Sequence, residues 1–245
     1  MSLNVQYRPK SFEDLTGQRH IVDIIKAQVA AQKFSHTYLL HGPRGTGKTT
    51  TARLLAKAVN IPSGDLLGDP IAQLIDKGQT IDYVEIDAAS HTGVDNIREE
   101  IIDKALYPPT QLKRKVYVID EVHMLSKGAF NALLKIMEEP PEYLLFILAT
   151  TEIYKVPDTI VSRSQVFNFK RLTIEDIVSR MEFVAQKEHI SYEPAALRLI
   201  AKMAHGGVRD AIKYLEQVSM LGEVTEQVVS SFLGVVSEQA IVDLL

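Results

Sequence analysis

The sequence predicts an α/β fold: a parallel sheet covered by helices on both faces, followed by a small helical bundle. Three observations support this prediction. Short apolar runs alternate with helical patterns up to about residue 170, a phosphate-loop pattern follows the first of these runs, and strand signals then stop. At 245 residues, the chain is long enough for one large domain or two smaller ones.

The composition is ordinary for a soluble globular protein, with 46% hydrophobic and 24% charged residues. No stretch approaches the roughly 18 unbroken apolar residues of a membrane span, and the opening MSLNVQYRPK lacks the apolar run of a secretory signal. The sequence contains 0 Cys, which excludes disulfides and cysteine-ligated zinc. We therefore expect a cytoplasmic protein.

The charge balance is mildly acidic. Because the net charge is −4, any nucleic-acid binding must come from a local patch or from helix N-termini. The short basic run at 113–115 precedes a predicted strand, and we interpret it as the end of a solvated loop.

The short apolar runs are predicted to be fully buried strands. They lie at 37–41, 83–87, 116–120, 144–150 and 166–169. Helical patterns between them include 49–59 and 128–138. The second helix places Phe130, Leu133, Leu134 and Met137 on one side, which is typical of core packing. The prolines at 140–141 then end it, because proline cannot continue a helix.

The region after residue 170 is predicted to be helical. Thr173 can cap a first helix whose apolar stripe includes Ile177 and Met181. Pro194 suits the first turn of a second helix, and 208–221 has the pattern of a third. We therefore predict three segments of the chain: an α/β domain at 1–170, a helical domain at 171–236, and at 237–245 the start of a missing C-terminal domain.

A phosphate-binding loop is predicted at 42–49, where GPRGTGKT matches G-x-x-x-x-G-K-[ST] at every fixed position. Glycines let the backbone N–H groups turn towards a phosphate, and the following helix adds the positive end of its dipole. Lys48 would contact the β- and γ-phosphates of ATP, and the Thr49 hydroxyl would complete the Mg²⁺ shell. The predicted phosphate-binding residues are Gly42, Pro43, Arg44, Gly45, Thr46, Gly47, Lys48, Thr49 and Thr50.

Acidic residues follow the strand predicted at 116–120. Asp120 would hold the metal through water, and Glu121 would act as the base that polarises the attacking water. An Asp-Glu pair alone is usually a solvated turn, but together with the phosphate loop it favours catalysis. The next strand ends in Thr150 and Thr151, which brings a hydroxyl to the same sheet edge. Thr151 is our candidate for positioning the water or sensing the γ-phosphate; the alternative is a turn or cap threonine.

Longer motifs carry a family resemblance. The stretches YRPKSFEDLTGQ at 7–18, GPRGTGKTTTAR at 42–53 and EIDAASHTGVDNIREE at 85–100 resemble the bacterial DNA polymerase III gamma/tau family. VYVIDEVHMLSKGAFNALLKIMEEPPE at 116–142 and FILATTEIYKVPDTIVSRSQVFNF at 146–169 extend the resemblance over nearly the whole chain. It implies an AAA+ P-loop NTPase fold, with a RecA-like sheet domain and a three-helix lid.

The resemblance also implies roles for individual residues. Arg163 matches an arginine that reaches into the ATP site of a neighbouring subunit, although it could instead pair with a surface carboxylate. Arg209 matches the lid arginine that contacts the phosphates. Tyr7, Arg8 and Pro9 match the segment beside the adenine, with Arg8 as a surface residue being the alternative.

Two further expectations follow from the family. A helix opening near Thr92 and running through Arg98 is the candidate for sequence-independent DNA contacts, against the alternative of an ordinary packed helix. The family's four zinc-binding cysteines are missing from 60–81, so we predict no zinc site. Ser164 replaces the cysteine of the family's Ser-Arg-Cys motif, which leaves the Arg163 assignment unaffected.

The function predicted from the sequence is that of an ATP-dependent motor subunit of a clamp loader. Its partners would be other clamp-loader subunits in a hetero-oligomeric ring, the sliding clamp and primer–template DNA, and an isolated fragment would be monomeric. The chain shows no metal triad of a polymerase, so a DNA polymerase label would belong to the holoenzyme. The alternatives are another AAA+ DNA-processing motor, such as a branch-migration helicase, and a scaffold that has lost hydrolysis.

Overall fold

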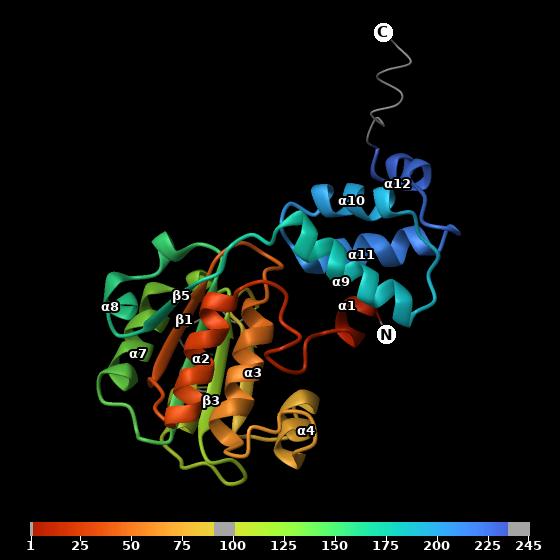
Figure 1. Ribbon diagram of the computed structural model, residues 1–245. Helices are drawn as coiled ribbons and strands as arrows, with labels where there is room; N and C mark the ends of the chain where they lie inside the picture. The colour runs from red at the N-terminus through yellow and green to blue at the C-terminus, as the bar shows by residue number, and fades with distance from the viewer. Residues whose placement is uncertain (1, 91–100, 235–245) are drawn as a thin grey trace. The chain divides into compact units, whose positions relative to one another are not determined.

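The computed structural model describes residues 2–90 and 101–234 (Figure 1). The chain forms two compact units. The sheet unit comprises Pro9–Gly42 and Lys48–Phe169. The helical unit comprises residues 2–8, Pro43–Gly47 and 170–234. The phosphate loop predicted from the sequence therefore contributes residues to both units.

The sheet unit is built on a five-stranded sheet in the order β2-β3-β4-β1-β5, and all neighbouring strands are parallel. The strands are β1 (Thr37–His41), β2 (Tyr83–Asp87), β3 (Lys115–Asp120), β4 (Leu144–Thr150) and β5 (Gln165–Asn168). The strands predicted from the apolar runs are confirmed, with bounds that agree to within one residue. Runs of this kind are expected when both faces of a parallel sheet are covered. The prediction of full burial was wrong for β2 and β5, which are partly exposed because they lie at the two edges of the sheet.

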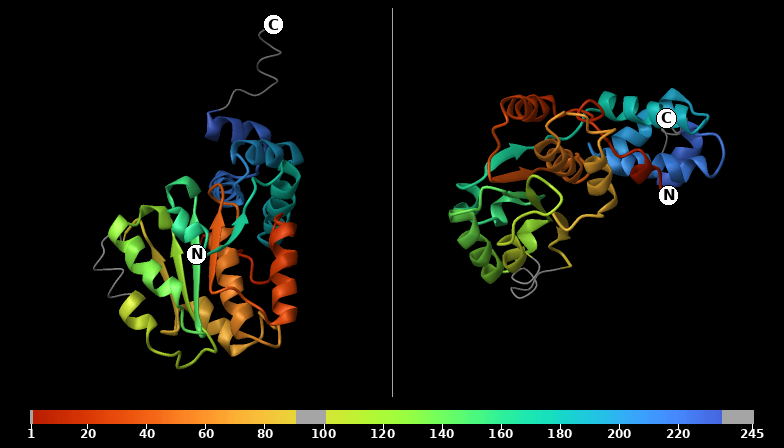
Figure 2. Two further views of the ribbon diagram at one scale, coloured as in Figure 1. Left: turned by 90° about the vertical axis from the view of Figure 1, so that its left-hand side faces the viewer. Right: turned by 90° about the horizontal axis from the view of Figure 1, so that it is seen from below.

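Alternate side chains of β1, β2, β3 and β4 enter two separate cores, one on each face of the sheet, whereas β5 contributes Phe167 to one of them. Leu145 and Ile147 of β4 belong to one core, whereas Phe146 and Leu148 belong to the other. Helices α2 and α3 pack in the first core and α7 in the second, so the sheet lies between two helical layers (Figure 2). The helices of this unit are α2 (Arg19–Ala31), α3 (Lys48–Asn60), α4 (Pro70–Lys77), α6 (Asp103–Ala105), α7 (Lys127–Glu138) and α8 (Asp158–Val161).

The helical unit has its own core, formed by α9 (Ile174–Lys187), α10 (Pro194–Met203), α11 (Val208–Ser219), α12 (Glu226–Leu233) and α1 (Leu3–Gln6). Thr173 caps α9 as predicted: its hydroxyl accepts from the Asp176 N–H at 3.1 Å, and the Asp176 carboxylate accepts in return from the Thr173 N–H.

The helices predicted after residue 170 are confirmed, and two short helices are additional. In α12, the cap residue Thr225 accepts from the Val228 N–H, while Leu3 of α1 is buried in the same core. Neither helix was predicted, because each offers too few residues to show a helical period. The tail predicted at 237–245 lies outside the described residues.

The segment that corresponds to the family's cysteine-bearing stretch folds around α4. Asp69 caps this helix by accepting from the Ile71 N–H at 2.8 Å, and Ala72 and Ile75 enter the same core as α3. Among residues 2–90 and 101–234, no group of three or more His, Cys, Asp or Glu side chains is arranged to hold a metal ion. Apolar burial thus anchors the segment to α3.

An ion pair also joins this segment to α3. The Lys57 Nζ lies 2.7 Å from the Asp76 Oδ2, and only 1% of the Lys57 side chain is exposed. A buried ammonium needs such a partner, because burying an unpaired charge is costly.

None of the helices between residues 2 and 90 or between 101 and 234 combines the length and apolar character that a membrane crossing requires.

The ion pair gives a first prediction. Asp76→Ala should lower the free energy of unfolding by about 1–3 kcal/mol, because it removes the carboxylate that the buried Lys57 ammonium contacts. The measurement is urea unfolding followed by circular dichroism. Adding Lys57→Met to Asp76→Ala should restore part of the loss, because an apolar side chain needs no counter-charge. An Asp76→Ala protein as stable as the parent would contradict this account of the segment.

Candidate functional site

The carboxyl ends of β1, β3 and β4 meet at one edge of the sheet unit. The register pairs His41 with Thr150, and Asp87 with Asp120. Open parallel sheets bind ligands at this edge. The sheet-unit residues predicted to act on a nucleotide include Gly42, Lys48, Thr49, Thr50, Asp120, Glu121 and Thr151.

Gly42 turns the chain out of β1 at a point with no room for a side chain. Its φ is +146°, its N–H donates to the Thr150 carbonyl at 3.2 Å, and an added Cβ would lie 2.2 Å from the Phe169 carbonyl oxygen. Backbone does not yield to such a contact. A glycine is therefore required here, for the close approach as well as for the turn.

Lys48 folds back over the start of the loop. Its Nζ donates to the Gly42 carbonyl at 2.8 Å, and only 6% of the residue is exposed. Burial lowers the pKa of Lys48, and the nearby Glu121 and Asp120 carboxylates oppose this shift. The Lys48 ammonium is thus buried beside the first residue of the loop, a position that suits it to binding a phosphate.

Thr49 and Asp120 form the part of the site that fits a hard divalent cation. The Thr49 hydroxyl donates to the Asp120 Oδ2 at 2.7 Å, and the Asp120 Oδ1 accepts the Glu121 N–H at 2.9 Å. A hydroxyl and a carboxylate in contact supply oxygen ligands, which Mg²⁺ prefers, with its remaining positions left for water and phosphate. The two residues predicted to hold Mg²⁺ therefore lie together.

Glu121 has a constrained conformation. Its backbone is left-handed, with φ 47° and ψ 43°, which is uncommon for a residue other than glycine. Its Oε2 accepts from Thr151, both from the N–H at 3.3 Å and from the hydroxyl at 3.1 Å. The predicted base and the predicted sensing threonine are therefore in direct contact.

His123 belongs to this cluster and was not predicted from the sequence. Only 6% of its side chain is exposed, and its Nδ1 lies 3.4 Å from the Glu121 Oε2. The same Nδ1 lies 2.9 Å from the Thr150 Oγ1, and the Nε2 lies 3.2 Å from the Glu152 Oε1. The available signal was a histidine three residues after Asp120, in the short connection between β3 and α7.

The helical unit holds the middle of the phosphate loop together with Arg209. The Val208 N–H, at the start of α11, donates to the Gly45 carbonyl at 3.1 Å. A Cβ added to Gly45, whose φ is +75°, would lie 3.5 Å from the Arg209 Cβ. Within this unit, the predicted lid arginine therefore lies beside the loop segment, and its side chain is exposed. Arg44 in the same segment is also exposed, whereas Thr46 is buried and donates to the Pro43 carbonyl.

Tyr7 packs on α9 within the helical unit. Its hydroxyl donates to the Glu188 Oε1 at 2.6 Å, and this hydrogen bond raises the pKa of Tyr7. Its ring meets Phe183 edge-on, and its carbonyl accepts from Arg180. The role of Tyr7, Arg8 and Pro9 beside an adenine stays a prediction.

Arg163 lies on the surface of the sheet unit, after α8. Its guanidinium donates to the Thr159 carbonyl at 3.0 Å and pairs with the Glu138 Oε1 at 3.1 Å. The side chains of Arg163 and Glu138 are 38% and 55% exposed, so the surface pair considered from the sequence is present. Exposed pairs of this kind contribute little to stability. The candidate DNA helix around Thr92–Arg98 lies outside the described residues.

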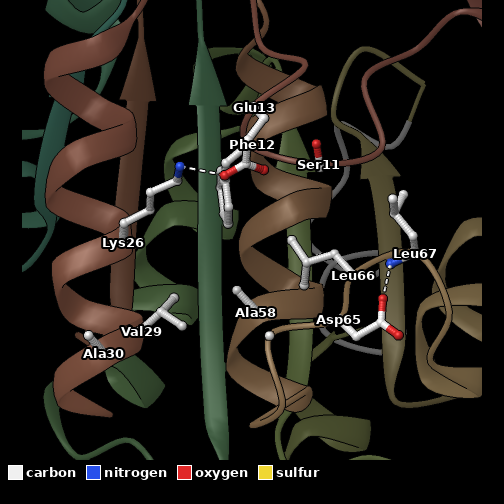
Figure 3. Close-up of a pocket in the computed structure, with 11 residues that line it drawn as sticks. Ser11, Phe12, Glu13, Lys26, Val29, Ala30, Ala58, Asp65, Leu66 and Leu67 are labelled. Carbon is white, nitrogen blue, oxygen red and sulfur yellow. Dashed lines mark hydrogen bonds and ion pairs between the residues drawn. The ribbon is translucent and has the colours of Figure 1, made fainter.

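A separate pocket of about 410 Å³ lies elsewhere on the sheet unit, between α2, the end of α3 and the loop at 64–67 (Figure 3). Phe12, Val29 and Leu66 give it an apolar wall, and the Lys26–Glu13 ion pair lies at one side. Its lining contains none of the residues predicted to bind nucleotide.

Comparisons with known proteins support the sequence resemblance. Residues 17–173 match a family model described as "DNA polymerase III, delta subunit". Residues 176–223 match a model described as "DNA polymerase III clamp loader subunit, ATPase lid domain".

Curated relatives carry matching names. The chain is 49% identical over 224 residues to the DNA polymerase III subunit tau of Bacillus subtilis, covering 89% of this chain and 39% of the relative. It is 42% identical over 247 residues to subunit tau of Escherichia coli, covering 98% and 38%. It is 43% identical over 241 residues to subunit gamma of Buchnera aphidicola, covering 96% and 66%. The chain thus spans about two fifths of the length of these two tau relatives.

Among solved structures, the Thermotoga maritima RuvB Holliday junction branch migration motor superposes with a TM-score of 0.68 and 22% identity. The match covers 92% of this chain and 71% of RuvB. At this identity the likeness shows the fold alone.

The crowding at Gly42 gives a second prediction. Gly42→Ala should weaken ATP binding at least about tenfold and lower the melting temperature, because the new methyl group would displace the loop or β5. Titration with a fluorescent ATP analogue and thermal unfolding measure the two effects. Gly64→Ala is the matched control: Gly64 also has a positive φ of +76°, but an added Cβ meets nothing within 4 Å. Equal ATP affinity in Gly42→Ala and the parent would contradict the proposed role of this contact.

Proposed function

The chain belongs to the DNA polymerase III clamp-loader subunit family, and from this membership we propose that it is an ATP-driven motor subunit that loads a sliding clamp onto primed DNA. The observation that carries the proposal is the contact of Thr49 with Asp120 at the edge of the sheet, beside the buried Lys48. Other clamp-loader subunits, the sliding clamp and primer–template DNA are the proposed partners, and the cytoplasm is the proposed location.

Each residue of the site would have a distinct role in hydrolysis. Lys48 would neutralise the β- and γ-phosphates of ATP, while Thr49 and Asp120 would hold Mg²⁺. The bound ion would supply charge neutralisation at the phosphate oxygens. Glu121 would accept a proton from the attacking water, and Thr151 would orient the Glu121 carboxylate through its two hydrogen bonds. Arg209, beside the loop segment at Gly45, would add a second positive charge.

Arg163 would complete the site of an adjacent subunit. A guanidinium supplied in trans stabilises the charge that develops during phosphoryl transfer, an effect of roughly 10³–10⁵ in rate for GTPases. To reach a neighbouring subunit, Arg163 would give up its exposed contact with Glu138 and bind a phosphate of the neighbour's ATP. The free-energy cost of breaking the contact would be small, because exposed ion pairs are weak. Hydrolysis would then depend on assembly.

Two rival functions are less well supported. A branch-migration motor shares the fold, but the RuvB likeness rests on 22% identity, whereas the family models and relatives carry DNA polymerase III names. A scaffold without hydrolysis would have no need for Lys48, Thr49, Asp120 and Glu121 in the arrangement described above.

The proposal predicts the behaviour of an Arg163→Ala variant. The full-length protein, reconstituted with its clamp-loader partners, should hydrolyse ATP faster with clamp and primed DNA. Arg163→Ala should lose at least about tenfold in this stimulated rate while it still binds ATP, because the arginine acts on a neighbour's site.

Two variants serve as controls. Glu138→Ala removes the surface pair but keeps the arginine, and Arg198→Ala removes another exposed arginine that lies 3.8 Å from Glu175. Both should hydrolyse ATP at rates close to that of the parent. If Arg163→Ala is equally active, or if DNA and clamp leave the rate unchanged, the clamp-loader proposal fails.

A further inference from the structure

His123 is a buried imidazole with a polar partner at each nitrogen. It lies in the turn η2 (Val122–Met124) between β3 and α7. Its Nδ1 is 2.9 Å from the Thr150 Oγ1, and its Nε2 is 3.2 Å from the Glu152 Oε1. A ring that merely filled space would need neither partner, and an unsatisfied ring nitrogen here would be costly.

The hydrogen bonds around His123 form a closed ring with one consistent set of donors. The Glu152 N–H donates to the Thr150 Oγ1 at 3.0 Å, which leaves the proton of that hydroxyl free to point at the Nδ1. The Glu152 carboxylate also accepts from Lys155 at 2.8 Å, and this hydrogen bond is the first cause that lowers the pKa of Glu152. An ionised carboxylate can only accept, so the proton of a neutral His123 lies on Nε2.

These hydrogen bonds connect the turn at 150–152 to the turn that contains Glu121. Thr151 lies between Thr150 and Glu152 and donates both its N–H and its hydroxyl to the Glu121 Oε2. With its proton on Nε2, His123 cannot donate from Nδ1 to that oxygen, which lies 3.4 Å away, so it acts on Glu121 through Thr150 and Glu152. The end of β4 and the turn after β3 are therefore connected by two sets of contacts. Thr151 donates to Glu121, and His123 contacts Thr150 and Glu152.

We propose that His123 is a positioning residue for Glu121. Its imidazole ties the turn at Thr150–Glu152 to the turn after β3, so that the carboxylate and Thr151 are held together in one orientation. The left-handed backbone of Glu121 makes such support necessary, because strained backbone persists only when its surroundings hold it. This inference rests on the proposed function, in which Glu121 accepts the proton from water.

The test compares His123→Phe with His123→Gln in the full-length protein, reconstituted with its clamp-loader partners. Phenylalanine fills the site without polar contacts, whereas the glutamine amide can reach the Nε2 position and donate to Glu152. His123→Phe should bind ATP with a Kd within about threefold of the parent, because the side-chain contacts described for His123 are to Thr150, Glu152 and Glu121 rather than to the phosphate loop. Its kcat should fall about 10- to 100-fold, as expected for a small misplacement of a reacting group. His123→Gln should recover a large part of kcat.

A readout that does not depend on hydrolysis uses the nucleotide-free protein. Nitrogen NMR of the imidazole should show the proton on Nε2. Amide hydrogen exchange at Thr151 should speed up in His123→Phe and return towards the parent rate in His123→Gln. If His123→Phe is too unstable to measure, Thr150→Val removes the contact at Nδ1 and should also speed exchange at Thr151.

The outcomes separate this inference from the proposed function. An unchanged kcat and an unchanged Thr151 exchange rate in His123→Phe would overturn the positioning role. Equal losses of ATP binding and kcat, with no recovery in His123→Gln, would also overturn it in favour of a structural role. If Glu121→Gln leaves hydrolysis intact, the proposed function fails, while the exchange measurement still decides whether His123 holds the turn.

Discussion

The close parallel register of β1 with its neighbours is the constraint on which the sheet unit depends. Because His41 lies opposite Thr150, the chain leaves β1 level with the end of β4. Gly42 then donates to the Thr150 carbonyl and leaves no room for a Cβ against Phe169 of the segment after β5. A shift of one residue in any of these strands would reverse its faces and separate the loop from the acidic end of β3.

Much of this arrangement follows from the sequence. The three central strands were predictable because both faces of the sheet are buried there, which makes each of them a short apolar run. The edge strands β2 and β5 are only partly buried, which their sequences alone did not indicate. The phosphate loop and Asp120 were predictable because their chemistry depends on local spacing. The roles of Arg163 and Arg209 came from the family resemblance, since neither spacing nor composition assigns a function to a lone arginine.

The remaining features depend on contacts between distant residues. His123 acquires its partners from a turn 27 residues later in the chain, so no local pattern reveals them. The helices α1 and α12 are too short to show a period, and their burial depends on α11 for α1 and on α10 and α11 for α12. The segment Pro43–Gly47 directly follows β1 in the sequence, so one would expect it to belong to the sheet unit. It belongs instead to the helical unit, because of contacts with residues distant in the sequence.

The contacts of the α4 segment determine which solution conditions affect the stability of this region. In a loop organised by cysteines and zinc, folding free energy is metal-binding free energy, and it therefore depends on metal supply and thiol oxidation. Here Leu66, Ala72 and Ile75 are buried in the core of α3, and Lys57 pairs with Asp76. The stability of the region therefore responds to temperature through its apolar burial, and to ionic strength through a partly exposed ion pair.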